Sequence, residues 1–130
     1  MKIIMLIGAL LCMFCPAVAS SAQDCSKADN TREIVACHEE RYRNADRELN
    51  RIYGESMKGL SPAAQQKLKE SQRAWLRYRD TGLALAIELN KETRSYGDVV
   101  IADYRATVVE KRALELRYLF SGPADGPVKW

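Results

Sequence analysis

Residues 30–59 read NTREIVACHEERYRNADRELNRIYGESMKG, and this stretch sets the fold class. Asn30 and Glu33 fit a capping box at a helix start, with Asn in place of the usual Ser or Thr. Side chains suited to a buried face then recur at three- and four-residue spacing. They are Ile34, His38, Tyr42, Ala45, Leu49 and Ile52. The pattern predicts a long amphipathic helix from Asn30 to the region of Ser56 to Gly59.

A second helical period follows at once. Ser61 and Pro62 match an N-cap and a proline at the first helical position. No strong breaker appears until about Asn90, although Gly82 weakens the middle of the segment. The side chains expected on its inner face are Ala64, Leu68, Ser71, Trp75, Tyr78, Gly82, Ala86 and Leu89.

The third helical period comes after a polar linker, Lys91 to Gly97. We expect this helix to run from Asp98 to Phe120, with an apolar side made of Ile101, Val108, Val109, Leu116 and Leu119. Glycines and prolines between Gly122 and Pro127 end it, so we expect residues 121–130 to form a flexible C-terminal tail.

Helical periods dominate the chain, and alternating strand patterns of useful length are missing beyond the N-terminal region. The predicted fold is all-α, a small antiparallel bundle of about three long helices. A bent helical hairpin with the third helix laid across it is the alternative topology. The predicted helical domain covers residues 23–120 and is small enough for a covalent link to matter.

The N-terminus has the organisation of an export signal. Lys2 supplies the positive charge, an apolar run extends from Ile3 to Cys15, and small residues follow Pro16. Cleavage after Ala19 or after Ala22 fits the small-x-small rule, which makes residues 1–22 a signal peptide. The run is shorter than a bilayer span of about 20 residues, so no stable membrane anchor is expected.

Cysteine usage agrees with export. Cys12 and Cys15 fall inside the predicted signal and leave with it, so only Cys25 and Cys37 remain. Two cysteines in an exported chain suggest one disulfide. They are too few, even with the single histidine His38, to fill a zinc site.

Charge and motifs argue against several functional classes. Loss of Lys2 with the signal leaves 19 basic and 17 acidic residues, a net charge of +2, with the signs interspersed. That pattern is typical of a solvated surface and not of a nucleic-acid interface. The sequence has no glycine-rich phosphate loop and no nucleophile elbow, and none of its acids is marked as a catalytic pair. We therefore expect neither an enzyme nor a bound cofactor or metal, and we interpret His38 as a partly buried structural residue.

Two arginines fall on the apolar sides of their helices, where a charge requires a partner. Arg79 lies near Trp75 on the second helix, and Arg112 has a similar position on the third. We predict a structural polar network that fixes helix register, with Asp46 as the leading partner of Arg79; a binding site is the alternative interpretation. The predicted network consists of Asp46, Asn50, Gln72, Trp75, Arg79 and Arg112.

Several of these residues fall into two blocks that resemble a known family. The blocks are Ala45-Asp46-x-x-Leu49-Asn50-x-x-Tyr53 and Gln72-Arg73-x-Trp75-x-x-Tyr78-Arg79-Asp80, preceded by Asp24-Cys25 and Cys37. Together they resemble the LprI-like lysozyme-inhibitor family of exported bacterial proteins, a domain otherwise of unknown function. The resemblance implies a periplasmic or secreted helical protein. Many members carry two further cysteines, one of them where Leu83 stands here, and the loss of both supports pairing Cys25 with Cys37.

Two functions of different classes follow from the resemblance. The first is inhibition of a lysozyme or related muramidase by steric occlusion, with Arg94 and Tyr96 of the polar linker as candidate contact residues. The second is an envelope helical module that binds another partner or has a stress-related role.

Overall fold

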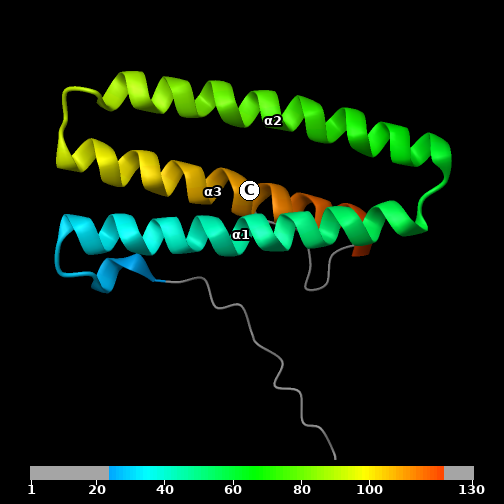
Figure 1. Cartoon of the computed structure of the whole chain (residues 1–130), viewed down its shortest axis with the longest axis horizontal. Coiled ribbons are helices and arrows are strands. Elements are labelled where there is room, and N and C mark those ends of the chain that lie inside the picture. The colour runs from blue at the N-terminus through cyan, green and yellow to red at the C-terminus, as the bar shows by residue number, and fades with distance from the viewer. Residues whose placement is uncertain (1–23, 122–130) are drawn as a thin grey trace, which may run out of the picture.

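The structure is a computed structural model of the chain, and it describes residues 24–121. One short 3-10 helix, η1 (Cys25–Lys27), precedes three long helices, α1 (Thr31–Gly59), α2 (Pro62–Asn90) and α3 (Ser95–Ser121). Helices α1 and α3 begin at the same end of the molecule, and α2 runs in the opposite direction (Figure 1). The predicted all-α bundle is confirmed. The predicted signal peptide lies outside the described residues, as do residues 122–130 of the predicted tail.

Local sequence signals fix the helix starts as predicted. The Asn30 side chain accepts a hydrogen bond from the Glu33 N–H at 3.1 Å, and Glu33 Oε2 accepts one from the Asp29 N–H at 3.1 Å. At the start of α2, Ser61 Oγ accepts a hydrogen bond from the Ala64 N–H at 3.3 Å. The Cys25–Cys37 disulfide is present and ties η1 to the first turns of α1.

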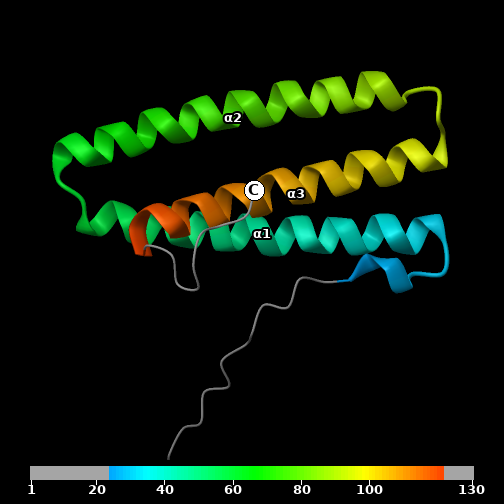
Figure 2. The same ribbon diagram turned by 180° about the vertical axis from the view of Figure 1, so that it is seen from behind.

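The hydrophobic core lies mainly between α1 and α3. Views from opposite sides show these two helices side by side over most of their length (Figure 2). Leu49 of α1 and Val109 and Leu116 of α3 are almost completely buried. The rest of the buried apolar cluster is Ala45, Ile52, Leu68, Val108 and Ala113.

Ion pairs join the same two helices beside this core. Arg41 donates to both carboxylate oxygens of Glu110, at 3.0 and 2.6 Å, and Arg105 donates to Glu39 at 2.6 Å. Near the other end, Arg117 of α3 donates to Glu48 of α1. The parallel pair is therefore fixed by an apolar seam and by ion pairs along its length.

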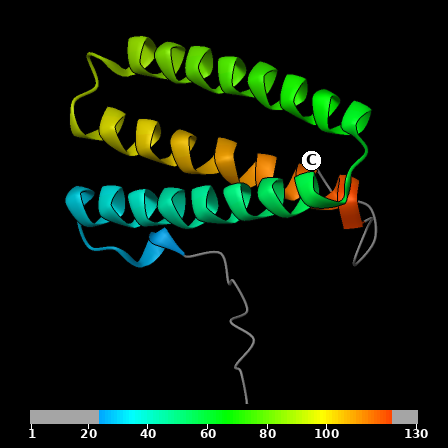
Figure 3. The same cartoon turned by 45° about the vertical axis from the view of Figure 1, so that its right-hand side comes forward.

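Helix α2 buries far fewer of its side chains than the sequence predicted. Leu68 is its only buried residue. Tyr78 and Leu89, both predicted on the inner face, are 64% and 70% exposed, and Leu119 of α3 is 63% exposed. These three assignments were wrong. Tyr78 and Leu89 are exposed because α2 packs on α3 but makes little contact with α1, and it forms the outer edge of the bundle (Figure 3).

The third helix also begins earlier than predicted, at Ser95 instead of Asp98. Gly97 is a poor helix former, which favoured a start after it. In the structure Gly97 is buried in the first turn, where a Cβ would lie 2.6 Å from the Asn90 carbonyl oxygen. This glycine permits the close approach of α2 and α3 at their connection.

Gly82 provides a second close approach, and it generates a prediction about the α2–α3 contact. A Cβ at Gly82 would overlap the Tyr104 hydroxyl and lie 2.9 Å from Tyr104 Cζ. We expect Gly82→Ala to lower the free energy of unfolding by about 1–3 kcal/mol, measured by urea denaturation. Gly54→Ala is the matched control, since nothing lies within 4 Å of its Cβ, and it should stabilise by about 0.5–1 kcal/mol. Adding Tyr104→Phe should partly restore the stability of Gly82→Ala, because it removes the hydroxyl that the new Cβ meets. Equal effects of Gly82→Ala and Gly54→Ala would contradict this account.

The Glu48 ion pairs predict a pH dependence. Hydrogen bonds from Arg51 and then Arg117 lower the pKa of Glu48 from 4.5 to about 2, against the opposing effect of burial. A lowered native-state pKa means that this stabilisation is present above pH 4.5 and is lost as the pH falls toward 2. Because Arg51 and Arg117 are about half exposed, we expect the loss to be only about 1 kcal/mol.

The measurement is the melting temperature from pH 6 down to pH 2, at roughly constant ionic strength. Glu48→Gln should flatten the acid side of this profile. Glu55→Gln should change it less, because it removes only an exposed pair with Arg51 within α1. If the melting temperatures of wild type and Glu48→Gln fell in parallel as the pH decreased, the Glu48 ion pairs would not contribute to stability.

Candidate functional site

The connection between α2 and α3 is a short, ordered turn, Lys91 to Arg94. The Thr93 hydroxyl donates to the Asn90 carbonyl at 2.8 Å, and the Asp98 N–H donates to the Arg94 carbonyl at 3.2 Å. Arg94 has a φ of 49°, in the left-handed region that few residues other than glycine adopt. Such strain at an exposed position is a feature that often accompanies function.

The two candidate contact residues lie at this turn. Arg94 is exposed, and its guanidinium forms no ion pair with any residue in 24–121. Tyr96 is 70% exposed. It belongs to the first turn of α3, which corrects its predicted place in a linker. The structure therefore places both residues on one end of the bundle, Arg94 on a loop and Tyr96 on a helix.

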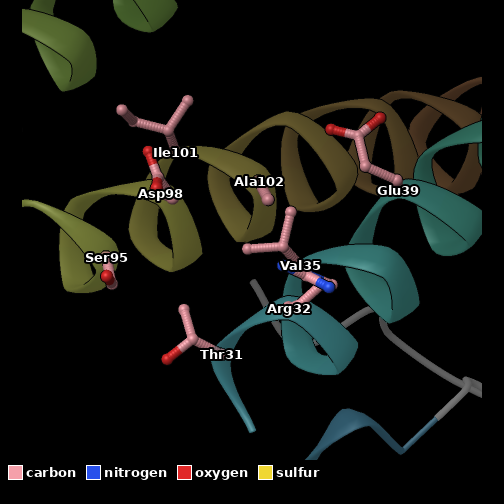
Figure 4. Close-up of a pocket in the computed structure, with 8 residues that line it drawn as sticks. All are labelled: Thr31, Arg32, Val35, Glu39, Ser95, Asp98, Ile101 and Ala102. Carbon is pink, nitrogen blue, oxygen red and sulfur yellow. The ribbon is translucent and has the colours of Figure 1, made fainter.

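A hollow of about 550 Å³ opens at the same end, between the first turns of α1 and α3. Thr31, Arg32 and Val35 come from α1, and Ser95, Asp98 and Ile101 come from α3 (Figure 4). Positive and negative side chains both line it, so it has no single charge preference. It adds a concave surface to the end that carries Arg94 and Tyr96.

A second hollow, which we call the motif groove, lies between α1 and α2. Its volume is about 480 Å³. Both sequence blocks line it, one from each helix. The first contributes Asp46, Leu49, Asn50 and Tyr53, and the second contributes Gln72, Arg73, Trp75 and Arg79, joined by Lys69 and Leu76.

The predicted polar network is not one network. Arg79 pairs with its neighbour Asp80 at 2.7 Å and lies over the Trp75 ring at 5.3 Å. Asp46 accepts a hydrogen bond from Asn50 at 3.1 Å, within α1. The expected Asp46–Arg79 pair is therefore wrong, because the open groove separates α1 from α2 and each polar side chain finds a partner on its own helix.

Arg112 is the arginine that is buried, with only 3% of its side chain exposed. It donates to Gln72 Oε1 at 3.1 Å and to Ser71 Oγ at 2.9 Å, both on α2, and to Glu115 at 2.9 Å. Its guanidinium also lies 5.9 Å from the centre of the Trp75 ring. The charge is satisfied, and these contacts are the main polar link between α2 and α3.

Sequence analysis missed a second, partly buried cluster, centred on Arg41. This residue donates to Asp103 at 2.8 Å as well as to Glu110, and it lies 2.8 Å from His38 Nδ1. The Glu110 hydrogen bond raises the pKa of Arg41, so the guanidinium stays charged. His38 is buried, as predicted, and lies 3.3 Å from Asp103. His38 and Arg41 are three residues apart on α1, and Asp103 and Glu110 are seven apart on α3, so each pair shares a helix face. This spacing was the available signal, but it does not show which helices pair.

Within the described part of the chain, no group of three His, Cys, Asp or Glu side chains could hold a metal ion. Between residues 24 and 121, no helix is long and apolar enough to cross a membrane.

The contrast between the two arginines gives a stability prediction. Arg112→Ala leaves a cavity and unpaired groups between α2 and α3, and we expect it to lower the free energy of unfolding by about 2–4 kcal/mol. Arg79→Ala loses a partly exposed pair and should cost about 1 kcal/mol or less. Chemical denaturation of both variants measures the difference. A cost for Arg79→Ala as large as that for Arg112→Ala would contradict the assignment of Arg112 as the main link.

Comparison with known proteins agrees with this architecture. The chain is similar to an uncharacterized protein of Rhizobium meliloti strain 1021, with 31% identity over 124 residues, covering 85% of this chain and 88% of that protein. No solved structure matches the chain significantly. Residues 21–116, which include η1, α1, α2 and most of α3, match the family described as lysozyme inhibitor LprI. The helical chain with its Cys25–Cys37 disulfide and its groove of motif residues therefore belongs to the LprI family.

Proposed function

We propose that the protein is exported to the periplasm or secreted, and that it inhibits a lysozyme-type cell-wall hydrolase by steric occlusion. The family supports the activity, since its description is that of an inhibitor and not of an enzyme. The N-terminal signal pattern supports export. The contact residues we propose are Arg94 and Tyr96, and the observation that carries this choice is their exposure at one end of the bundle, on the α2–α3 turn and the first turn of α3.

The exposed Arg94 side chain favours a carboxylate on the partner surface. Glycoside hydrolases of the lysozyme type carry two carboxyl groups on either side of the scissile bond. An unpaired guanidinium on an ordered turn can pair with such a carboxylate without first breaking an ion pair of its own. A net charge of +2 gives no long-range attraction to a basic enzyme, so the local pairing has to supply the specificity.

A cell-wall lysis assay with several lysozyme types tests this proposal. We expect wild-type protein to inhibit at least one of them, and Arg94→Ala/Tyr96→Ala to weaken inhibition by about tenfold or more, as for two interface anchors. Arg32→Ala is the matched control, because Arg32 is an exposed arginine at the same end and lines the neighbouring hollow. It should inhibit like wild type. No inhibition of any lysozyme at micromolar protein would reject the proposed activity.

One observation favours a second candidate, a helical module whose partner occupies the motif groove. Both family blocks line this groove, whereas Arg94 and Tyr96 lie outside them. Lys69 and Arg73 line this groove and are exposed. Neither side chain forms an ion pair with a residue in 24–121. Arg73→Glu in the same lysis assay separates the two surfaces. Inhibition lost with Arg73→Glu and kept with Arg94→Ala/Tyr96→Ala would move the contact to the groove.

A further inference from the structure

The two walls of the motif groove have the residue spacing of helix-packing faces. On α1, the lining residues from Asp46 to Tyr53 are separated by three, one and three positions. Lining residues of α2 repeat this spacing from Lys69 to Leu76, with Trp75 added. Side chains at such positions share one face of a helix and can meet a neighbouring helix. Because α2 makes little contact with α1, the two faces are not packed on each other.

The groove also has an apolar part. Tyr53 and Trp75 are partly buried and pack against the hydrophobic core, and Leu76 is partly buried as well. The guanidiniums of Arg79 and Arg112 lie 5.3 and 5.9 Å from the centre of the Trp75 ring. Because these cations already contact the ring, it offers apolar contact and not an open stacking platform for a sugar. The groove therefore suits the apolar side chains of a polypeptide.

The charges of the groove are divided unevenly between its walls. On the α2 wall, Lys69 and Arg73 are exposed, lie one helical turn apart and have no ion-pair partner in the described chain. The neighbouring acid, Glu70, pairs with Lys67 at 2.9 Å instead. The acidic lining residue, Asp46, lies on the opposite wall, on α1. Two positive charges on the α2 wall are therefore available to a partner.

We propose that the motif groove binds an acidic amphipathic helix of another protein. The apolar stripe of this helix lies against the apolar part of the groove, and two carboxylates beside the stripe, four residues apart, pair with Lys69 and Arg73. No existing ion pair of these two side chains has to break first. From Lys69 to Arg79 the groove extends about 15 Å along α2, which matches nearly three turns of a partner helix. The proposal rests on the second candidate function and names its class of partner.

The fluorescence of Trp75 measures binding in the groove, because Trp130→Phe leaves Trp75 as the only tryptophan of the chain. The probe is a synthetic helical peptide of about 20 residues, with a leucine stripe and glutamates four residues apart beside it. The control peptide has lysine in place of every glutamate. We expect the glutamate peptide to change the Trp75 emission saturably, and to bind at least about tenfold more tightly than the lysine peptide. Equal affinities would overturn the acidic class of partner.

Charge reversal in the protein tests the position of the site. Arg73→Glu should weaken binding of the glutamate peptide by at least about tenfold, and Lys69→Glu/Arg73→Glu should prefer the lysine peptide. Arg32→Glu is the matched control, because it makes the same change in net charge at an exposed arginine about 20 Å before Asp46 along α1. It should bind the glutamate peptide like wild type. Far-UV circular dichroism confirms that the variants keep their helices.

The titration contains no lysozyme, so its result is separate from that of the lysis assay. No saturable binding of the glutamate peptide up to roughly 100 µM would overturn the proposal and leave the groove to another occupant, such as residues 122–130 of this chain. Unchanged binding by Arg73→Glu would overturn it as well, since the site would then lie outside the groove. Loss of lysozyme inhibition with Arg73→Glu, without binding of the glutamate peptide, would keep the groove as a contact and overturn the acidic helix. Binding of the glutamate peptide by a protein that inhibits no lysozyme would support this inference and reject the inhibition.

Discussion

The fold depends on the parallel pairing of α1 and α3. The buried apolar centre of this pair is formed by Leu49, Val109 and Leu116. Arg41 fixes the register of the two helices through its hydrogen bonds to Glu110 and Asp103. Because Arg41 contacts two carboxylates of α3 at once, sliding one helix along the other would break several charge-assisted hydrogen bonds. The disulfide extends this pair by holding η1 against α1. Every other feature of the molecule is attached to this two-helix unit.

The small contribution of α2 to the core follows from this arrangement. With Leu68 as its one buried residue, α2 is held by its two short connections, by the Gly82–Tyr104 contact and by the Arg112 hydrogen bonds. A helix held in this way does not close on α1, and the space between them becomes the motif groove. The same looseness leaves Tyr78, Leu85 and Leu89 without cover. The groove and these exposed side chains are both consequences of one loosely packed helix.

Local signals in the sequence allowed the helices to be predicted, but they did not allow the contacts between helices to be predicted. The Asn30–Glu33 box and the Ser61–Pro62 start depend on neighbouring residues, and the structure confirms them. The disulfide followed from the cysteine count and the family resemblance, and it is confirmed as well. The Asp46–Arg79 pair failed because it required α1 and α2 to touch, whereas the tightest contact is between α1 and α3. A helical period shows that a face is apolar but not which helix covers it, so Tyr78 and Leu89 were assigned to the core. The contact roles of Arg94 and Tyr96 remain predictions.

The two candidate contact surfaces lie on different parts of the molecule. Arg94 and Tyr96 lie where α2 connects to α3, whereas the motif groove lies between α1 and α2. The two surfaces share no residue, so a partner that binds at the connection need not touch the groove. Substitutions at one surface can therefore be separated from substitutions at the other, and the two proposed modes of binding are distinguishable.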